Sequence, residues 1–230
     1  MFAGFDFDVI ERSLPYLWEG MLFSLGLTLL AMLGGIVLGT LLALMRLSDF
    51  TPFSVPAGAY VNLLRSTPLI LVIFWFYFLV PLIIKKLTGD PYMQGIGPFY
   101  SALIAFTMFE AAYYCEIIRA GIQSVPRGQV NAAYALGLRY PQAMAHVVLP
   151  QAFRNMVPIL LTQGIILFQD TSLVYVVGLT DFMGAASKVA QRDGRLVEMY
   201  LFAALVYFIL CFAASHFVKR LQVRFNPSSS

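Results

Sequence analysis

The sequence predicts an all-α membrane protein with about five transmembrane helices and a helical cytoplasmic loop between the third and the fourth. Of its 230 residues, 60% are hydrophobic and 12% are charged, whereas a soluble domain carries about 25% charged residues. Several uncharged runs reach the roughly 20 residues that a helix needs to cross a bilayer. Such a chain cannot cover a soluble surface, and we expect a single transmembrane domain over residues 1–230.

Uncharged runs place the predicted spans. Four runs hold no charged residue, namely 20–45, 66–84, 91–109 and 199–218, and a fifth run, 155–180, is interrupted only by Asp170. We predict spans near 21–45, 62–84, 98–118, 156–178 and 199–218, with a cytoplasmic loop at 119–155. The first run is too long for the core of a signal peptide, and four acids precede it, so we expect no cleavable targeting sequence.

The first two spans carry different packing signals. GGIVLG in the first span spaces Gly35 and Gly39 so that another helix can approach closely on one face. The second span is crowded with aromatic residues, which are expected to supply bulk facing lipid or the helix bundle.

Charge distribution sets the expected orientation. With the N-terminus outside, nine Lys and Arg residues lie on the inner side and six on the outer side. This bias agrees with the acidic N-terminal segment, so we expect the C-terminus in the cytoplasm. The net charge of +3 is scattered along the chain, which argues against a nucleic-acid surface.

Cysteine and histidine residues give no sign of a metal site. Cys115 and Cys211 both lie in apolar segments, where buried free thiols are expected rather than a disulfide. His146 and His216 have no further ligand at a useful spacing, so an exposed loop residue and an interfacial residue are expected.

The loop after the third span has the composition of folded structure. Residues 129–136 are rich in Ala and Leu and favour a helix, and Gly137 suits the position just past its end. Pro141 suits the first turn of a second helix, which Pro150 is expected to close. Apolar residues recur at helical spacing on one side of this helix: Met144, Val147 and Val148. This side needs a partner protein, or else it folds back on the chain's own helices.

This loop resembles the EAA loop of ABC importer permeases. Its sequence is NAAYALGLRYPQAMAHVVLP, and the motif is an acid-Ala-Ala triplet followed at fixed spacing by Gly, an aliphatic residue and Leu-Pro. The matching positions, expected to couple to the ATPase, are Asn131, Ala132, Ala133, Gly137, Val147, Leu149 and Pro150. Asn131 stands where the family usually has Glu. The literal EAA that begins at Glu110 falls inside the third predicted span and is not this motif.

Three further segments are similar to the polar amino-acid permeases of this family: YVNLLRSTPLI, EIIRAGIQSVPRGQ and FQDTSLVYVVGLTDF. Their combination most resembles the permeases of glutamate/aspartate importers. The resemblance implies a permease subunit of an ATP-driven importer in the bacterial inner membrane. A permease for glutamine, histidine or arginine is the alternative within the family.

The resemblance also implies partners. These are a cytoplasmic ATPase that receives the loop, a second and related permease chain, a periplasmic binding protein that delivers the amino acid, and membrane lipid. Closure of the ATPase pair would rock the spans from inward-open to outward-open. No GxxxxGK[ST] phosphate loop occurs in the chain, so we expect neither enzymatic activity nor a bound cofactor, the ATP being held by the partner.

Polar groups at membrane depth are the candidates for the substrate pathway, because a charge there costs about 2.5–3.5 kcal/mol and needs a protein or water partner. One cluster could break its helix and offer donors to a carboxylate, or merely cap a helix: Gln169, Asp170, Thr171 and Ser172. Glu110 lies either beside the pathway or in a helix-to-helix hydrogen bond. Arg65 is either a substrate counter-charge or a cytoplasmic anchor. Glu116 and Arg119 have the spacing to pair.

Two functions from other classes fit the sequence less well. An ion-coupled secondary transporter would leave the folded loop without a use, and no internal repeat is visible. An intramembrane enzyme would need a reactive pair, but Asp170 is the single Asp within a predicted span and no GxSxG or HExxH occurs. We therefore expect no catalytic residues.

Overall fold

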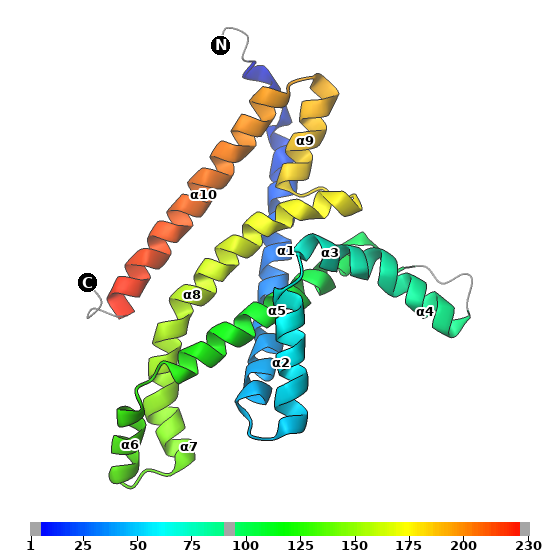
Figure 1. Cartoon of the computed structure of the whole chain (residues 1–230). Coiled ribbons are helices and arrows are strands. Elements are labelled where there is room, and N and C mark those ends of the chain that lie inside the picture. Colours follow the sequence, from blue (N-terminus) through cyan, green and yellow to red (C-terminus); the bar gives the residue numbers. More distant parts are fainter. Residues whose placement is uncertain (1–5, 90–94, 226–230) are drawn as a thin grey trace.

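A computed structural model describes residues 6–89 and 95–225, and all regular elements within these ranges are helical (Figure 1). In chain order they are α1 (Asp8–Leu47), α2 (Thr51–Arg65), α3 (Leu69–Phe74), η1 (Trp75–Leu79), α4 (Val80–Thr88), α5 (Pro98–Gln123), α6 (Arg127–Ala135), α7 (Tyr140–Ala143), η2 (Met144–Val148), α8 (Leu149–Asp170), η3 (Thr171–Val177), α9 (Phe182–Asp193) and α10 (Leu196–Phe225). Two of them, η1 and η2, are π-helical turns, and η3 is a 3₁₀ helix.

Five helical segments of the described residues are long and apolar enough to cross a membrane, as predicted: Asp8–Leu47, Leu69–Thr88, Pro98–Gln123, Tyr140–Val177 and Leu196–Phe225. The first begins well before the expected start near residue 21. The second begins at Leu69 instead of residue 62, because Pro68 disfavours helical geometry in the residue before it and separates α2 from α3.

Glycines let α1 and α5 come into close contact along the middle of the molecule. A Cβ placed on Gly39 would lie 2.8 Å from Cβ of Tyr114, and one on Gly35 would lie 3.0 Å from Cβ of Glu110. Any side chain at these two positions would therefore push the helices apart. The predicted close approach at Gly35 and Gly39 is confirmed, and the structure identifies α5 as the partner helix.

The short helix α9 packs against the N-terminal half of α1 and against α10 (Figure 1). Asp181 caps α9 by accepting hydrogen bonds from the backbone N–H groups of Met183 and Gly184, both at 2.9 Å. The N–H just before these two, that of Phe182, donates to Oγ of Ser24 on α1 at 3.1 Å. Burial raises the pKa of the Asp181 carboxyl to about 6, although these hydrogen bonds act in the opposite direction.

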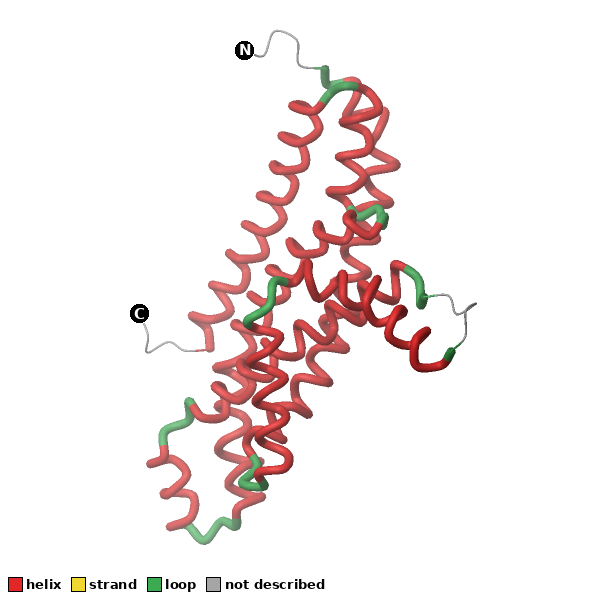
Figure 2. The backbone as a smooth tube through the Cα atoms, turned by 45° about the vertical axis from the view of Figure 1, so that its right-hand side comes forward, coloured by secondary structure: helices red, strands yellow, loops and turns green. Residues whose placement is uncertain are grey.

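The segment formed by α3, η1 and α4 projects from the bundle as an arm (Figures 1 and 2). It contacts the rest of the chain mainly through α5. Large apolar side chains are exposed along it: Leu71, Phe78, Leu79, Leu82, Ile83 and Leu87. Both free cysteines, Cys115 and Cys211, are buried, as expected from their apolar segments.

Candidate functional site

The loop that resembles the EAA motif joins α5 to α8 at the end of the molecule farthest from the N-terminus (Figure 1). We call α6, α7 and η2 together the elbow. Helix α6 ends at Ala135, and Gly137 has a φ of 82°, a left-handed conformation that glycine adopts without strain. The N–H of Leu138 donates to the carbonyl of Ala133 at 3.1 Å, and that of Gly137 donates to Tyr134 at 2.9 Å. These two bonds form a Schellman motif, which confirms the predicted helix end.

The prediction that Pro150 closes the second helix of the elbow is wrong. The helix starts at Tyr140, widens into the π-helical turn η2, and continues without a break into α8. The N–H of Leu149 donates to the carbonyl of Met144, five residues back, which is the hydrogen bond of a π turn. Pro150 then occupies the first turn of α8, where its missing N–H is tolerated. The second helix of the elbow, formed by α7 and η2, and the fourth span are therefore one continuous helix.

One face of the elbow packs on the chain's own helices. Val125, Val148 and Ala152 are buried together, with Met144 and Val130 against them. The predicted apolar side is thus covered from within, which is one of the two alternatives that the sequence left open.

Other apolar side chains at this end of the molecule are uncovered. Tyr134, Leu136 and Tyr140 of the elbow are exposed, and so are Leu149 and Phe153 in the first turns of α8. Leu136 is 83% exposed although it directly precedes the Gly137 turn. Of the motif positions, Asn131, Ala132, Gly137, Leu149 and Pro150 are exposed, Val147 is half-buried and Ala133 is buried.

Helices α5 and α8, which flank the elbow, are joined at three levels. Nearest the elbow, the amide of Asn155 donates to Oγ of Ser124 at 2.8 Å. Next, a Cβ on Gly121 would lie 2.9 Å from Cβ of Met156, so the two backbones are in close contact. Farthest from the elbow, Gln163 Nε2 donates to Oε1 of the buried Glu110 at 3.1 Å.

Three arginines surround Glu116 on α5. Nη2 of Arg119 lies 2.7 Å from Oε2, which confirms the predicted pair, and Nη1 of Arg65 lies 4.0 Å from the same oxygen. Arg46, from the last turn of α1, contacts the other oxygen, Oε1. The guanidinium of Arg65 also lies over the ring of Tyr113, 5.4 Å from its centroid. The structure thus places Arg65 in an ion cluster that joins α1, α2 and α5.

The polar cluster of residues 169–172 coincides with a change of helix type. The α-helix ends at Asp170, and Thr171 begins the 3₁₀ helix η3 directly after it, so the helix changes type at these residues, which we call the polar break. Thr171 is buried and its hydroxyl donates to the carbonyl of Phe168 at 2.7 Å. Asp170 and Ser172 are half-buried, and Gln169 is exposed. The carboxylate of Asp170 makes no hydrogen bond or ion pair within residues 6–89 and 95–225 and does not cap a helix.

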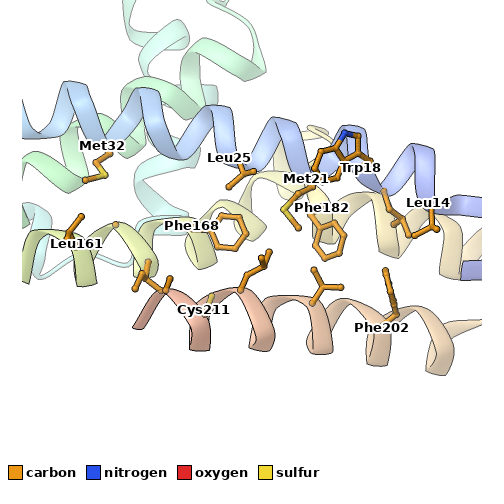
Figure 3. A pocket seen from close by; sticks show the side chains of 16 residues that line it. Leu14, Trp18, Met21, Leu25, Met32, Leu161, Phe168, Phe182, Phe202 and Cys211 are labelled. Atoms are coloured by element: carbon orange, nitrogen blue, oxygen red, sulfur yellow. The ribbon is translucent and has the colours of Figure 1, made fainter. Parts of the chain in front are cut away.

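A large cavity of about 640 Å³ opens between α1, α8 and α10 (Figure 3). Figure 3 shows Met21 and Leu25 of α1 and Phe202 of α10 directed into this space. Its walls are almost entirely apolar. A charged amino acid would lose its hydration here without gaining polar partners, so the cavity suits hydrocarbon instead of a polar substrate.

Sequence reasoning missed Gln163, which pairs with Glu110 across 53 residues of chain. The available signal was an amide inside an apolar run, because a polar group in a transmembrane helix needs a partner. It also missed the role of Arg46 beside Glu116, since proximity across three helices is not visible in spacing along the chain.

Comparisons with known proteins agree with this architecture. Residues 35–227 match the family described as "Binding-protein-dependent transport system inner membrane component". The chain is 54% identical over 220 residues to the glutamate/aspartate import permease protein GltK of Escherichia coli O157:H7, covering 96% of this chain and 98% of the relative. It is 33% identical to the arginine transport system permease protein ArtQ of Bacillus subtilis, covering 94% and 95%.

A solved structure, described as a crystal structure of an amino acid ABC transporter with histidines, superposes with a TM-score of 0.86 at 30% identity. The superposition covers 95% of this chain and 98% of that one. A methionine ABC transporter in an inward-facing conformation superposes with a TM-score of 0.73 at 20% identity and shows the same fold.

Proposed function

The chain belongs to the family of inner membrane components of binding-protein-dependent transport systems, and from this premise we propose the function of its parts. It is a multi-pass permease subunit of an ABC importer. We propose that glutamate and aspartate are its substrates. The observation that carries this proposal is 54% identity to a glutamate/aspartate permease across 96% of the chain, against 33% to an arginine permease.

The elbow is proposed as the surface that receives the force of ATP hydrolysis from a partner ATPase. Its uncovered face, with Tyr134, Leu136 and Tyr140, needs a protein partner because exposed apolar side chains at a loop tip are costly in water. Most of the motif residues are exposed as well, namely Asn131, Ala132, Gly137, Leu149 and Pro150. Asn131 is exposed on α6, so its amide would contact the ATPase through neutral hydrogen bonds in place of a carboxylate charge.

The continuous helix from Tyr140 to Val177 supports this coupling role. A movement of α7 and η2 is passed directly to the fourth span, since the helix continues from η2 into α8 without a loop. The polar break at Asp170 lies at the far end of the same α-helix. Force applied at α7 and η2 would therefore reach the candidate substrate pathway along one continuous helix.

The pathway itself is proposed to pass the polar break. Asp170 is unpaired among the described residues and could bind the amino group of the substrate, while the hydroxyl of Ser172 could donate to a carboxylate. We assign Glu110 and Arg65 to helix contacts near this pathway, because each already has partners within the chain. Gln169 and Thr171 complete the break.

The family also indicates two further partner proteins for this chain. We propose a second, related permease chain against the exposed arm of α3 and α4, and a periplasmic binding protein at the end opposite the elbow. The elbow carries Arg127 and Arg139, with Arg154 just beyond it, and this basic end is proposed to face the cytoplasm with the N-terminus outside.

Uptake competition tests the substrate proposal. The permease is reconstituted with its ATPase, companion permease and binding protein, and import of radiolabelled glutamate is measured with and without ATP. Unlabelled glutamate and aspartate should suppress uptake, whereas glutamine and arginine should not. Stronger competition by glutamine or arginine would overturn the assignment, and import without ATP would overturn the ABC mechanism.

A further inference from the structure

Glu110 is a completely buried acid in the third span, with an exposed fraction of 0%. It lies on the face of α5 that packs against α1, where Gly35 is so close that a Cβ would be 3.0 Å from Cβ of Glu110. From the other side, Gln163 of α8 donates its amide to Oε1 at 3.1 Å. The carboxyl group therefore sits where three helices meet.

Neutral and acidic groups lie around Glu110, and no ion pair offsets its charge within residues 6–89 and 95–225. The groups that act on it are the neutral amide of Gln163, the hydroxyl of Tyr114 on its own helix, and a second acid, Asp170 of α8. The facing part of α1 is glycine. No Lys, Arg or His side chain of the described residues forms an ion pair with Glu110.

Two buried oxygens lack partners at this place. Oε2 of Glu110 and the hydroxyl of Tyr114, one turn further along α5, have no hydrogen-bond partner of good geometry among the described residues. An ionised carboxylate would be buried in a dry environment without an ion-pair partner among the described residues, which is strongly unfavourable. A protonated carboxyl avoids this cost, and the Tyr114 hydroxyl, which can donate or accept, can pair with Oε2 in that form too.

Glu116 on the same helix shows the opposite arrangement. It is partly exposed and is contacted by Arg46, Arg65 and Arg119. Desolvation with no counter-charge favours the neutral form of a carboxyl, and nearby cations favour the ionised form. One helix thus holds two carboxyl groups in environments that select different protonation states.

We propose that Glu110 is a neutral, protonated positioning residue that ties α5 to α8 through Gln163, so that the two helices flanking the elbow move together. Its role in coupling rests on the proposed function of the elbow. Gly121 and Ser124 join the same helices nearer the elbow, about 16–21 Å from Glu110 at 1.5 Å per residue. The Glu110–Gln163 bond extends this connection deep into the membrane.

The tie also lies between the elbow and the substrate pathway. Gln163 precedes Asp170 by about two turns on α8. Without the Glu110–Gln163 hydrogen bond, the elbow could move the start of α8 while α5 and the polar break stay in place. ATP would then be hydrolysed without a matching import of substrate.

The test compares substitutions that keep or remove the neutral hydrogen bond. In the reconstituted complex, Glu110→Gln is neutral and similar in shape, so import per ATP hydrolysed should stay within about twofold of the wild type. Glu110→Leu and Gln163→Leu remove the bond and should lower that ratio by about tenfold or more while the complex still assembles. Glu116→Gln should lower import per ATP hydrolysed, whereas Glu110→Gln should not. The reason is that Glu116→Gln leaves three arginines without their counter-charge.

Infrared spectroscopy reads the proton directly. The wild type should show the carbonyl stretch of a protonated carboxylic acid that is absent from Glu110→Gln, and this measurement needs no transport. Absence of that difference band would overturn the protonated state. If Glu110→Gln uncouples as strongly as Glu110→Leu, the residue acts as a charge and the proposal is wrong. Failure of the wild type to import glutamate would contradict the proposed function alone, because the infrared result stands separately.

Discussion

Gly121 of α5 and Met156 of α8 leave no space between them for another side chain: a Cβ on Gly121 would lie 2.9 Å from Cβ of Met156. These residues hold together the two helices that lead into and out of the elbow. Gly121→Val should force the helices apart and destabilise the protein by about 1–3 kcal/mol. Thermal unfolding in detergent measures this change.

The matched control for this substitution is Gly128→Ala on α6, where an added Cβ meets nothing within 4 Å. That variant should keep a melting temperature close to the wild-type value. Equal stability of Gly121→Val and Gly128→Ala would contradict the close packing of α5 on α8.

Gly137 tests the coupling role of the elbow. Its φ of 82° disfavours any residue with a Cβ, so Gly137→Val should distort the end of α6 at a cost of about 1–2 kcal/mol. ATP-dependent import should fall sharply, and binding of the ATPase should weaken. Co-purification and transport assays measure the two effects.

Gly194 offers a control with the same kind of strain at the opposite end of the molecule. It follows α9, its φ is 68°, and an added Cβ meets nothing within 4 Å. Gly194→Val should cost a comparable amount of stability but leave ATPase binding unchanged. Normal assembly and normal import by Gly137→Val would show that the elbow is not the coupling surface.

Gly39 tests the contact of α1 with α5. Because a Cβ there would lie 2.8 Å from Cβ of Tyr114 and 2.9 Å from a backbone carbonyl, Gly39→Val should destabilise the protein by about 1–3 kcal/mol or prevent folding. Gly26 of the same helix has open space around it, and Gly26→Ala should be neutral or stabilising by about 0.5–1 kcal/mol. Expression level and detergent melting temperature distinguish the two, and a stable Gly39→Val protein would argue against this helix pairing.

Asp181 predicts a pH dependence outside the spanning segments. Burial raises its pKa to about 6 in the folded state, above the ordinary value of 3.8, so the folded state binds a proton more tightly than the unfolded state does. This contribution to stability is fully present below pH 3.8 and is lost as the pH rises through about 6. Its size is about 1–3 kcal/mol, from roughly 1.4 kcal/mol per unit of pKa shift.

Substitutions at Asp181 separate its charge from its cap. Asp181→Asn keeps a side-chain acceptor for Met183 and Gly184 and should equal or exceed the stability of the wild type at pH 7, with the difference shrinking at pH 4. Asp181→Ala loses the cap, which costs about 0.5–2 kcal/mol. Melting curves at the two pH values measure this, and a wild type clearly more stable than Asp181→Asn at pH 7 would show that the buried charge is favourable.

Local signals in the sequence predicted much of the elbow and little of the contacts between helices. Gly137 was recognisable as a helix end because the required backbone conformation depends on a single residue type. Pro150 was misread because a proline is a helix breaker in one register and harmless in the first turn of another, and the π turn η2 sets that register. The sequence shows that a charge on Glu110 would cost free energy within the membrane. Its partner Gln163 is 53 residues away along the chain, so spacing could not reveal the pair.

By itself, the sequence determined the membrane class, the number of spans and the end of α6, since apolar length and local backbone preference act within a few residues. Tertiary structure alone decided that α5 packs on the glycines of α1, that three arginines share Glu116, and that Glu110 faces an amide instead of a cation. Helices in a bilayer gain little from hydrophobicity when they associate, so close packing and single polar contacts between distant segments select their partners.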